Sequence, residues 1–412
     1  MSRPAFIDAY PPFDARQLVG EYGSPLFVFF PEVLLGNIER FRGALTRHYP
    51  NHILAYSVKT NYLPYAVRKI LDYGVVPEII AGLELDLLEK LGGIDSKTIV
   101  NGPLKTEAEL RRIIGHGCRI NVDNFTELEV LEQLGREAGR VIEVGLRVGA
   151  ALSKAHWLRF GFRFEDGEVL EAARRVRADM PHLKIIGLHL HGGTNVTDLD
   201  YYTAGSRLLC DLARQLSALG LMEIKYLDLG GGFATDCPFK DKAEWAVPTA
   251  DAYVTAMTAP IRNAFGADGP TLIIEPGRYL IDSAFLLLTT VERFRGLDQS
   301  EVVLDAGINV FPSARFRRHR FENLSGGLRP EKKYTLFGPL CMQSDCLGED
   351  VALPELRAGD VLAVDYAGAY SISQSWVFIR LNPAVVAVEA GAHKLVRERE
   401  NVHHFLRRDV QY

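Results

Sequence analysis

Short apolar runs alternate with amphipathic stretches between about residue 50 and residue 275. Eight runs have the length and composition of buried β-strands: residues 52–58, 76–81, 98–101, 119–122, 142–148, 184–190, 225–229 and 271–275. Most of the segments between them have helical spacing. Strands that alternate with helices predict parallel βαβ units, and eight such units predict a (β/α)8 TIM-like barrel.

Two of the intervening segments show the helical pattern in detail. Residues 81–92 place four leucines on one predicted face: Leu83, Leu87, Leu88 and Leu91. Residues 106–117 begin with a capping-box pattern, in which Thr106 is followed three positions later by Glu109. We therefore expect a helix in each segment.

The pattern changes after Glu275. Six β-like runs are joined by turns with little helical periodicity: residues 285–294, 301–307, 333–338, 360–370, 376–381 and 384–390. We expect an α/β plus all-β chain, in which a barrel over residues 31–276 precedes a C-terminal β-sandwich or β-barrel domain over residues 277–412. Residues 23–30 are also strand-like, so the N-terminal segment 1–30 is predicted to join the β domain.

Composition narrows the class of protein. The 412 residues carry a net charge of −5, which argues against nucleic acid as a partner. No apolar run is long enough to cross a bilayer, and the first residues lack the apolar centre of a signal peptide. The five cysteines show no Cys-x-x-Cys spacing, so we expect reduced thiols, a cytoplasmic location and no metal site.

The carboxyl ends of barrel strands are where barrel enzymes carry their chemistry. Residues 52–58 run into Lys59, whose amine could form a Schiff base with a carbonyl cofactor. The simpler alternative is a strand that ends on a soluble residue. Residues 225–229 run into glycines 230–232, whose N–H groups can approach a phosphate closely, although a plain tight turn explains such a run equally well. Together the two features predict pyridoxal 5'-phosphate.

Three further residues gain roles around such a cofactor. Glu275 is predicted to lie beside the pyridine nitrogen and to keep it protonated, which makes the ring an electron sink. His191 follows residues 184–190 and is predicted to stack on the ring, although a lone histidine at a strand end is more often structural. For His189 we expect a structural role, as a hydrogen-bonded residue of the strand. Arg278 is predicted to neutralise the phosphate or to bind a substrate carboxylate.

Two motifs in the predicted β domain also carry chemistry. Cys341 lies in "GPLCMQSD" after a Gly-Pro turn, and Tyr370 lies in "AGAYSIS". A cysteine in a β domain is usually a small buried hydrophobe. Near a carbanion it could instead donate a proton, because its reference pKa is about 8.5.

The ordered motifs resemble those of the fold type III pyridoxal-phosphate decarboxylases, the group of ornithine, diaminopimelate and arginine decarboxylases. The motifs that match are "YSVKTN", "HLHGGTN", "LDLGGGF", "EPGR", "GPLCMQSD" and "AGAY". The resemblance implies an alanine racemase-like fold and a homodimer with active sites at the interface. It implies that Lys59 forms the Schiff base, that His191 stacks on the ring and that Glu275 binds the pyridine nitrogen.

The resemblance also assigns the phosphate and proton-transfer residues. The phosphate contacts fall on Gly231 and Gly232 of the glycine run, on Thr194 in the place of a signature serine, and on Gly277, Arg278 and Tyr370. Cys341 is implied to protonate the product carbanion from across the dimer interface, with Asp345 nearby.

Two departures from the family concern the part of the site that holds the far end of the substrate. Met342 stands where diaminopimelate and ornithine decarboxylases carry an acidic residue. Phe311 stands where the diaminopimelate type has an arginine before proline, and Arg315 where it has a tyrosine. The predicted substrate residues are therefore Arg278, Arg315, Met342 and Asp345, in a pocket that is rebuilt around an intact cofactor site.

Residues 314–320 hold four arginines and a histidine, which are either a solvated loop or a contact for an anionic substrate. The favoured hypothesis is decarboxylation of an anionic or carrier-tethered amino-acid conjugate, as in siderophore or antibiotic biosynthesis. The alternatives are a diaminopimelate- or ornithine-type decarboxylase of primary metabolism, an amino-acid racemase on the same fold, and a non-catalytic homologue.

Overall fold

The computed structural model describes residues 6–80, 82–152, 159–266, 268–326 and 329–410. The chain forms two compact units. One contains residues 38–234 and 246–278, and the other contains residues 1–37, 235–245 and 279–412. Within the described ranges, no helix combines the length and the apolar character needed to cross a membrane.

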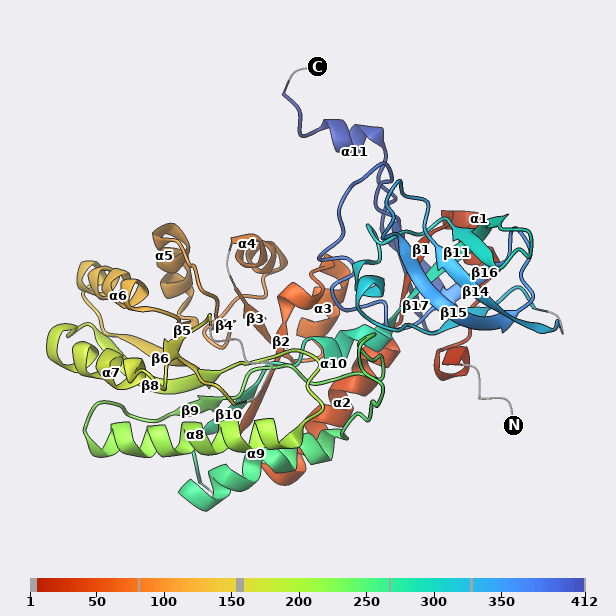
Figure 1. The fold of residues 1–412 in the computed structure, drawn as a ribbon. Coiled ribbons are helices and arrows are strands. Elements are labelled where there is room, and N and C mark those ends of the chain that lie inside the picture. The colour runs from red at the N-terminus through yellow and green to blue at the C-terminus, as the bar shows by residue number, and fades with distance from the viewer. Residues whose placement is uncertain (1–5, 81, 153–158, 267, 327–328, 411–412) are drawn as a thin grey trace. The chain divides into compact units, whose positions relative to one another are not determined.

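The first unit is a closed parallel barrel, as the sequence predicts (Figure 1). Its eight strands lie within two residues of the predicted runs: β2 (His52–Ser57), β3 (Val76–Ile79), β4 (Ile99–Val100), β5 (Arg119–Val122), β6 (Ile142–Gly149), β8 (Leu183–Leu190), β9 (Tyr226–Asp228) and β10 (Thr271–Ile274). The order β5-β4-β3-β2-β10-β9-β8-β6 closes where β5 pairs with β6, and the short strand β7 (Phe162–Arg163) adds to β6.

Helices cover the outside of this barrel (Figure 1). They are α2 (Pro31–His48), α3 (Pro64–Asp72), α4 (Gly82–Leu91), α5 (Glu107–His116), α6 (Phe125–Ala138), α7 (Glu168–Asp179), α8 (Leu199–Ala218) and α9 (Ala250–Phe265). The predicted capping box of α5 is present, with Thr106 as N-cap. The predicted face of α4 is wrong in part, because Leu83 is 63% exposed whereas Leu85 and Leu88 are buried.

Part of the barrel interior combines apolar side chains with a large aromatic ring. Ala55, Ile99, Ile186 and Ile273 form a buried cluster with Tyr226. Two glycines make room for that ring, because a Cβ on Gly187 would lie 2.3 Å from Cζ of Tyr226 and one on Gly145 would lie 2.1 Å from its hydroxyl. The barrel therefore encloses a tyrosine that the pattern of the strands alone does not predict.

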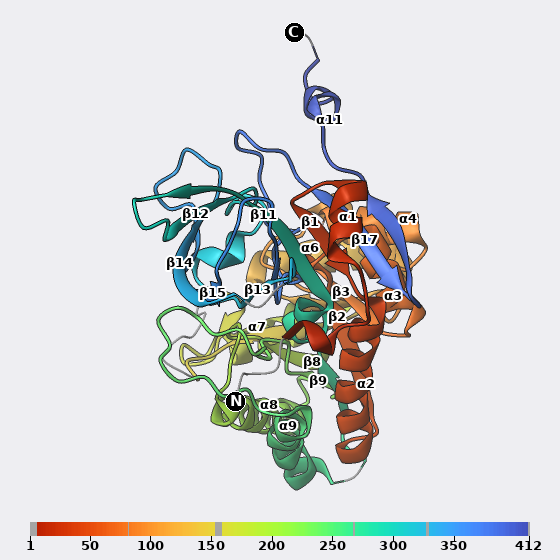
Figure 2. The same ribbon diagram turned by 90° about the vertical axis from the view of Figure 1, so that its right-hand side faces the viewer.

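The second unit is mostly sheet (Figures 1 and 2). Its strands are β1 (Leu26–Phe29), β11 (Phe285–Arg295), β12 (Glu301–Leu304), β13 (Phe321–Asn323), β14 (Glu331–Phe337), β15 (Cys346–Pro354), β16 (Val361–Val364), β17 (Ala384–Glu389) and β18 (Ala392–Arg397). Short helical segments accompany them: η1 (Phe6–Ala9), α1 (Ala15–Tyr22), α10 (Arg278–Ile281), η3 (Asp282–Ala284), η4 (Pro312–Arg315) and α11 (Val402–Leu406).

Strand β1 lies between β11 and β17, antiparallel to the first and parallel to the second. Its Leu26 and Val28 join Leu286, Leu288 and Val386 in the core of this unit. The N-terminal segment thus supplies an inner strand to a sheet built mainly from the C-terminal third of the chain.

One predicted strand of this unit is wrong. Residues 376–381 form only an isolated bridge between Phe378 and Arg380. The side-chain amide of Asn309 donates to the carbonyls of Trp376 and Arg380, at 3.4 and 3.3 Å, in the place that a neighbouring strand would take. The aromatic and β-branched composition of the run therefore does not produce a ladder.

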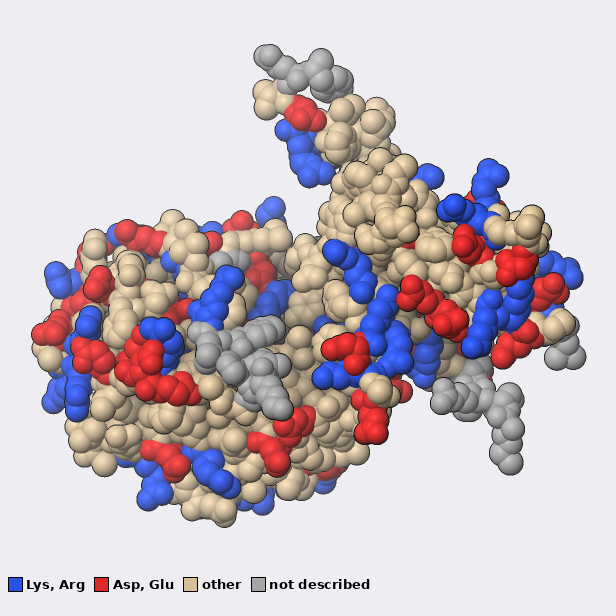
Figure 3. Space-filling view, viewed as in Figure 1, with Lys and Arg blue, Asp and Glu red and all other residues tan. Residues whose placement is uncertain are grey.

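Charged side chains of both signs are interspersed over the face in Figure 3. Such a mixed surface agrees with the small net charge of −5.

Candidate active site

Lys59 lies directly beyond the carboxyl end of the first barrel strand. It follows β2 in the short 3-10 helix η2 (Val58–Thr60). The turn after β10 packs against this segment, because a Cβ on Gly277 would lie 2.0 Å from Oγ1 of Thr60. The glycine lets the chain segments that follow β2 and β10 approach each other closely.

The amine of Lys59 lies beside a buried carboxylate. Nζ of Lys59 is 3.9 Å from Oε2 of Glu78, a residue of β3 with no exposed side-chain surface. Burial raises the pKa of Glu78, although the charge of Lys59 counteracts this shift. The Lys59 side chain is itself 39% exposed. Part of the Lys59 side chain is therefore in contact with solvent.

Glu275 follows β10 and belongs to a buried polar cluster. Its Oε1 accepts a hydrogen bond from Asn101 at 2.7 Å, and its Oε2 lies 3.6 Å from Nε2 of His189. Burial opposes ionisation, but His189, Asp228 and Asn101 stabilise the charged form and lower the pKa of Glu275. Burial and the charge of Glu275 raise the pKa of Asp228 well above its usual value.

A chain of side-chain hydrogen bonds runs from Glu275 through the barrel interior. Asn101 also donates to Oε1 of Glu78 at 3.0 Å and accepts from Asn121 at 2.9 Å. Asn121 in turn accepts a hydrogen bond of 2.7 Å from the hydroxyl of Tyr226. Asn101 therefore contacts both buried carboxylates and fixes their orientation.

His191 follows β8 and lies half-buried against the glycine loop. Its Nδ1 accepts a hydrogen bond from the N–H of Gly231 at 3.1 Å, which requires the tautomer protonated at Nε2 when the ring is neutral. Burial, together with the charges of Lys59 and Arg147, lowers the pKa of His191 well below its usual value. The ring is therefore neutral.

Arg147 of β6 supports this arrangement from inside the barrel. Its Nη1 lies 3.3 Å from Oδ1 of Asp123, and its Nη2 donates to the carbonyl oxygen of His191 at 3.5 Å. Its guanidinium also stacks on the ring of Phe160 at 4.7 Å. The buried cation thus holds the backbone of the histidine loop.

The glycine loop after β9 packs on two neighbouring loops. Gly230 and Gly232 have positive φ angles of 60° and 92°, which favour glycine. A Cβ on Gly231 would lie 2.4 Å from the carbonyl oxygen of Glu275, and one on Gly232 would lie 2.8 Å from that of Gly193. The loop of Thr194 is joined to it by a hydrogen bond of 2.8 Å from Val196 N–H to the Gly232 carbonyl.

Replacing Gly231 by alanine should destabilise the protein by about 1–3 kcal/mol, because two backbones would have to move apart. Urea unfolding measures this change. Gly115→Ala is the matched control, since Gly115 lies within α5 with nothing near its Cβ position, and it should leave stability equal or slightly higher. Equal stabilities of Gly231→Ala and Gly115→Ala would contradict the packing described.

The second unit carries the remaining predicted residues. Cys341 is exposed, and the neighbouring Met342 is 37% exposed. Asp345 is buried, and its two carboxylate oxygens accept hydrogen bonds from the N–H groups of Ile308 (2.8 Å) and Leu340 (2.7 Å). The carboxylate of Asp345 therefore shapes the turn that presents Cys341.

Tyr370 lies at the end of a loop that is anchored to Asp282. The N–H of Gly368 donates to the carbonyl of Asp282, and the N–H of Ala369 donates to its carboxylate, both at 3.0 Å. Tyr370 has a positive φ of 62°, a strained conformation for a bulky residue. The structure thus fixes the backbone that leads into Tyr370.

The arginine cluster of residues 314–320 is only partly available to a ligand. Arg317 is fully buried and forms an ion pair of 2.8 Å with Asp282. Arg320 pairs with Asp365, and Arg318 donates to the carbonyl of Lys242. Arg315 is exposed. The hypothesis that Arg317 meets an anionic substrate is wrong, because its guanidinium is enclosed within the protein.

Arg317→Met should destabilise the protein by about 3–5 kcal/mol, because it leaves Asp282 buried without its partner. Arg315→Met is the control and should change stability by less than about 0.5 kcal/mol, because Arg315 is exposed. Both values come from chemical denaturation. A neutral effect of Arg317→Met would show that the ion pair does not hold this unit together.

Several residues of the site escape prediction from the sequence. Glu78, Asn101, Asn121 and Arg147 lie on barrel strands or directly after one, among apolar neighbours. A polar residue within a predicted buried strand is the one signal that could have found them. It does not reveal which of them meet.

Known proteins resemble this chain over most of its length. A family model described as pyridoxal-dependent decarboxylase, pyridoxal binding domain, matches residues 35–282. Diaminopimelate decarboxylase of Methanocaldococcus jannaschii is 30% identical, over 98% of this chain and 94% of the relative. Diaminopimelate decarboxylase of Neisseria meningitidis is also 30% identical, over 94% of this chain and 95% of the relative.

A solved structure shows the same fold. The crystal structure of the M. jannaschii diaminopimelate decarboxylase has a TM-score of 0.89 and 27% identity, and it covers 97% of this chain and 95% of that chain. The likeness extends over the barrel and the mostly-sheet unit alike.

Proposed function

Since the chain belongs to the pyridoxal-dependent decarboxylases, we propose that it releases CO2 from diaminopimelate, with Lys59 as the residue that binds the cofactor. The observation that supports this substrate is the likeness to diaminopimelate decarboxylases over nearly the whole chain. It favours a decarboxylase of primary metabolism over the siderophore or antibiotic hypothesis, for which none of these relatives provides support.

The residues after the barrel strands fit pyridoxal 5'-phosphate. They offer an accessible amine at Lys59, an ionised buried carboxylate at Glu275 and a loop of three glycines without side chains. When bound, the cofactor supplies an electron sink for the carbanion that remains after CO2 leaves. The residues proposed to hold its phosphate are Thr194, Gly231, Gly232, Gly277, Arg278 and Tyr370.

The protein side chains have distinct tasks in this proposal. The ionised Glu275 keeps a proton on the ring nitrogen, and Asn101 holds the carboxylate in place for it. The neutral His191 packs against the ring face without adding a second positive charge. Cys341 delivers a proton to the carbon that has lost its carboxylate.

The far end of the substrate meets residues that differ from the family pattern, and we propose that Met342 and Arg315 contact it. Both side chains have exposed surface, as this requires. Asp345 then acts as a positioning residue, because backbone N–H groups occupy both of its oxygens.

A substrate panel tests the proposal. Purified, cofactor-loaded protein is given diaminopimelate, ornithine, lysine or arginine, and CO2 release is measured together with the amine product. We expect the highest kcat/KM with diaminopimelate. A preference for ornithine would contradict the substrate assignment, and loss of optical rotation without CO2 would indicate a racemase.

We also propose a homodimer in which Cys341 of one subunit serves the site of the other. Lys59→Ala and Cys341→Ala proteins, each impaired alone, are mixed under conditions that exchange subunits. Hybrid dimers then carry one intact site, so activity should rise to about a quarter of the wild-type value. No recovery in a mixture that demonstrably exchanges would place Cys341 in the site of its own chain.

A further inference from the structure

A cavity of about 310 Å³ opens at the amino-terminal ends of the barrel strands. Arg119, Tyr226 and Thr271 line it, and each is the first residue of its strand. Lys59, His191 and Glu275 follow the carboxyl ends of their strands. The cavity is therefore separate from the candidate active site and lies at the opposite end of the same barrel.

The cavity has an excess of positive charge. Three cationic side chains line it, Arg119, Arg140 and Lys225, against the single carboxylate of Glu143. Glu143 is paired with Lys225. Among the described residues, neither guanidinium has a carboxylate partner, and the buried Nη1 of Arg119 has no hydrogen-bond partner. An anion in the cavity would pair with these two positive charges.

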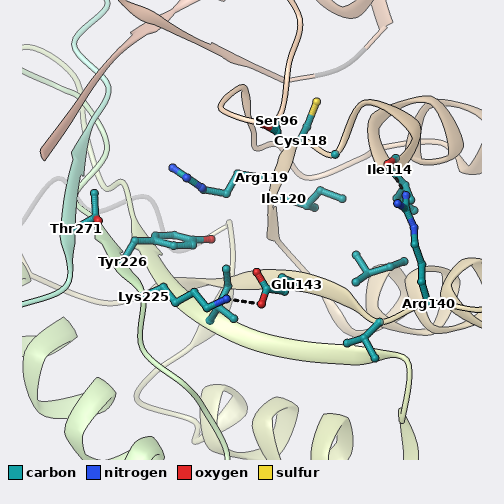
Figure 4. Close-up of a pocket in the computed structure, with 14 residues that line it drawn as sticks. Ser96, Ile114, Cys118, Arg119, Ile120, Arg140, Glu143, Lys225, Tyr226 and Thr271 are labelled. Carbon is teal, nitrogen blue, oxygen red and sulfur yellow. Dashed lines mark hydrogen bonds and ion pairs between the residues drawn. The ribbon is translucent and has the colours of Figure 1, made fainter.

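Figure 4 shows the guanidinium of Arg119 beside Tyr226 and Thr271 and that of Arg140 beside Ile114, with Ile120 between them. Arg119 lies over the ring of Tyr226, 5.6 Å from its centroid, and Arg140 donates to the carbonyl of Ile114 at 2.5 Å. Ile120 and Ile142 form part of the wall. Two cationic ends with an apolar middle match a ligand with two carboxylates on a short carbon chain.

One wall of the cavity is preformed. The hydroxyl of Tyr226 is fixed by its hydrogen bond to Asn121, and Gly145 and Gly187 enclose its ring. The guanidinium of Arg119 rests on that ring. This fixed wall loses little entropy when a ligand binds, and the volume of the cavity is at the lower end of the range for small-molecule pockets.

We propose that this cavity is a binding site for a small aliphatic dicarboxylate, held by Arg119 at one end and Arg140 at the other. The proposal is independent of the substrate assignment, because it concerns the other end of the barrel. Its test is likewise a binding measurement that does not depend on turnover.

Titration calorimetry of the cofactor-loaded protein with glutarate, butyrate and inorganic phosphate tests it at low ionic strength. We expect glutarate to bind with one site per chain and at least about tenfold more tightly than butyrate, because one charge-assisted contact is missing from the latter. Phosphate carries its charge on a single centre without an apolar chain and should also bind more weakly. Equal affinities for glutarate and butyrate, or no binding of glutarate, would overturn the proposal.

Variants locate the bound glutarate. Arg119→Gln and Arg140→Gln should each weaken its binding at least about tenfold. Arg140 is exposed, so its replacement leaves the fold unchanged. Arg174→Gln, which removes an exposed arginine of α7 outside the cavity, is the matched control and should bind glutarate as the wild type does. Unchanged affinity in both test variants would place glutarate elsewhere, including the active site, and would overturn the assignment.

Discussion

Lys59→Ala should lower the kcat for CO2 release by at least about 10⁴-fold, because it removes the amine that binds the cofactor covalently. The visible absorbance of the cofactor-loaded protein should disappear in the same variant. Lys59 follows a barrel strand and lies beside the buried Glu78. Stopped assays of CO2 release and absorbance spectra measure the two effects.

Two further variants separate the covalent role of this lysine from its charge. Lys59→Arg keeps a cation near Glu78 but cannot bond to an aldehyde in the same way, so it should be as inactive as Lys59→Ala. Lys90→Ala removes an exposed lysine of α4 and should retain full activity. Substantial activity in Lys59→Arg would show that the charge, and not the bond, is what the site needs.

Glu275→Gln should lower kcat by about 100- to 1,000-fold, because it replaces an ionised carboxylate by a neutral group of the same shape. The hydrogen bond from Asn101 and the packing near His189 can persist, so the fold should be retained. Single-turnover CO2 release measures the effect, and urea unfolding checks the stability.

Glu275→Asp restores the charge with a shorter side chain and should recover part of the lost rate. Glu129→Gln, on the exposed side of α6, is the control for removal of a carboxylate and should behave as the wild type. If Glu275→Gln retained nearly full activity, the carboxylate would not be the partner of the ring nitrogen.

The barrel could be predicted because its signals are local. Each strand is a short apolar run between turns, so all eight predicted runs lie within two residues of the observed bounds. The helix after Thr106 is specified by a capping box of four residues. Lys59, His191 and the glycine loop could be placed on one rim because all of them follow strands of one parallel barrel.

Other features depend on contacts between distant parts of the chain. Asn101 meets Glu275 across 174 positions, and Tyr226 meets Asn121 across 105. No local pattern encodes such pairs. Arg317 lies in a charged run that favours a solvated loop, yet it is buried because Asp282 provides its partner. The sequence shows that this run is rich in arginine. It does not show that the carboxylate of Asp282 pairs with Arg317.

The β unit was harder to predict for the same reason. The apolar pattern does not predict strand β15, because this strand carries Glu349 and Asp350 in its middle and lies at one end of its sheet, where exposed positions interrupt the alternation. Residues 376–381 have the composition of a strand, but the side-chain amide of Asn309 binds their carbonyl groups where a neighbouring strand would bind them. In both cases the contacts with neighbouring segments, and not the local composition, determine whether the run forms a strand.

Borohydride treatment of the cofactor-loaded wild type, followed by peptide mass spectrometry, tests the central claim most directly. Reduction fixes the bond between cofactor and amine, so the account predicts one pyridoxyl-phosphate label per chain, on the peptide that contains Lys59. A label on a different lysine, or a protein that carries none after reduction, would contradict it.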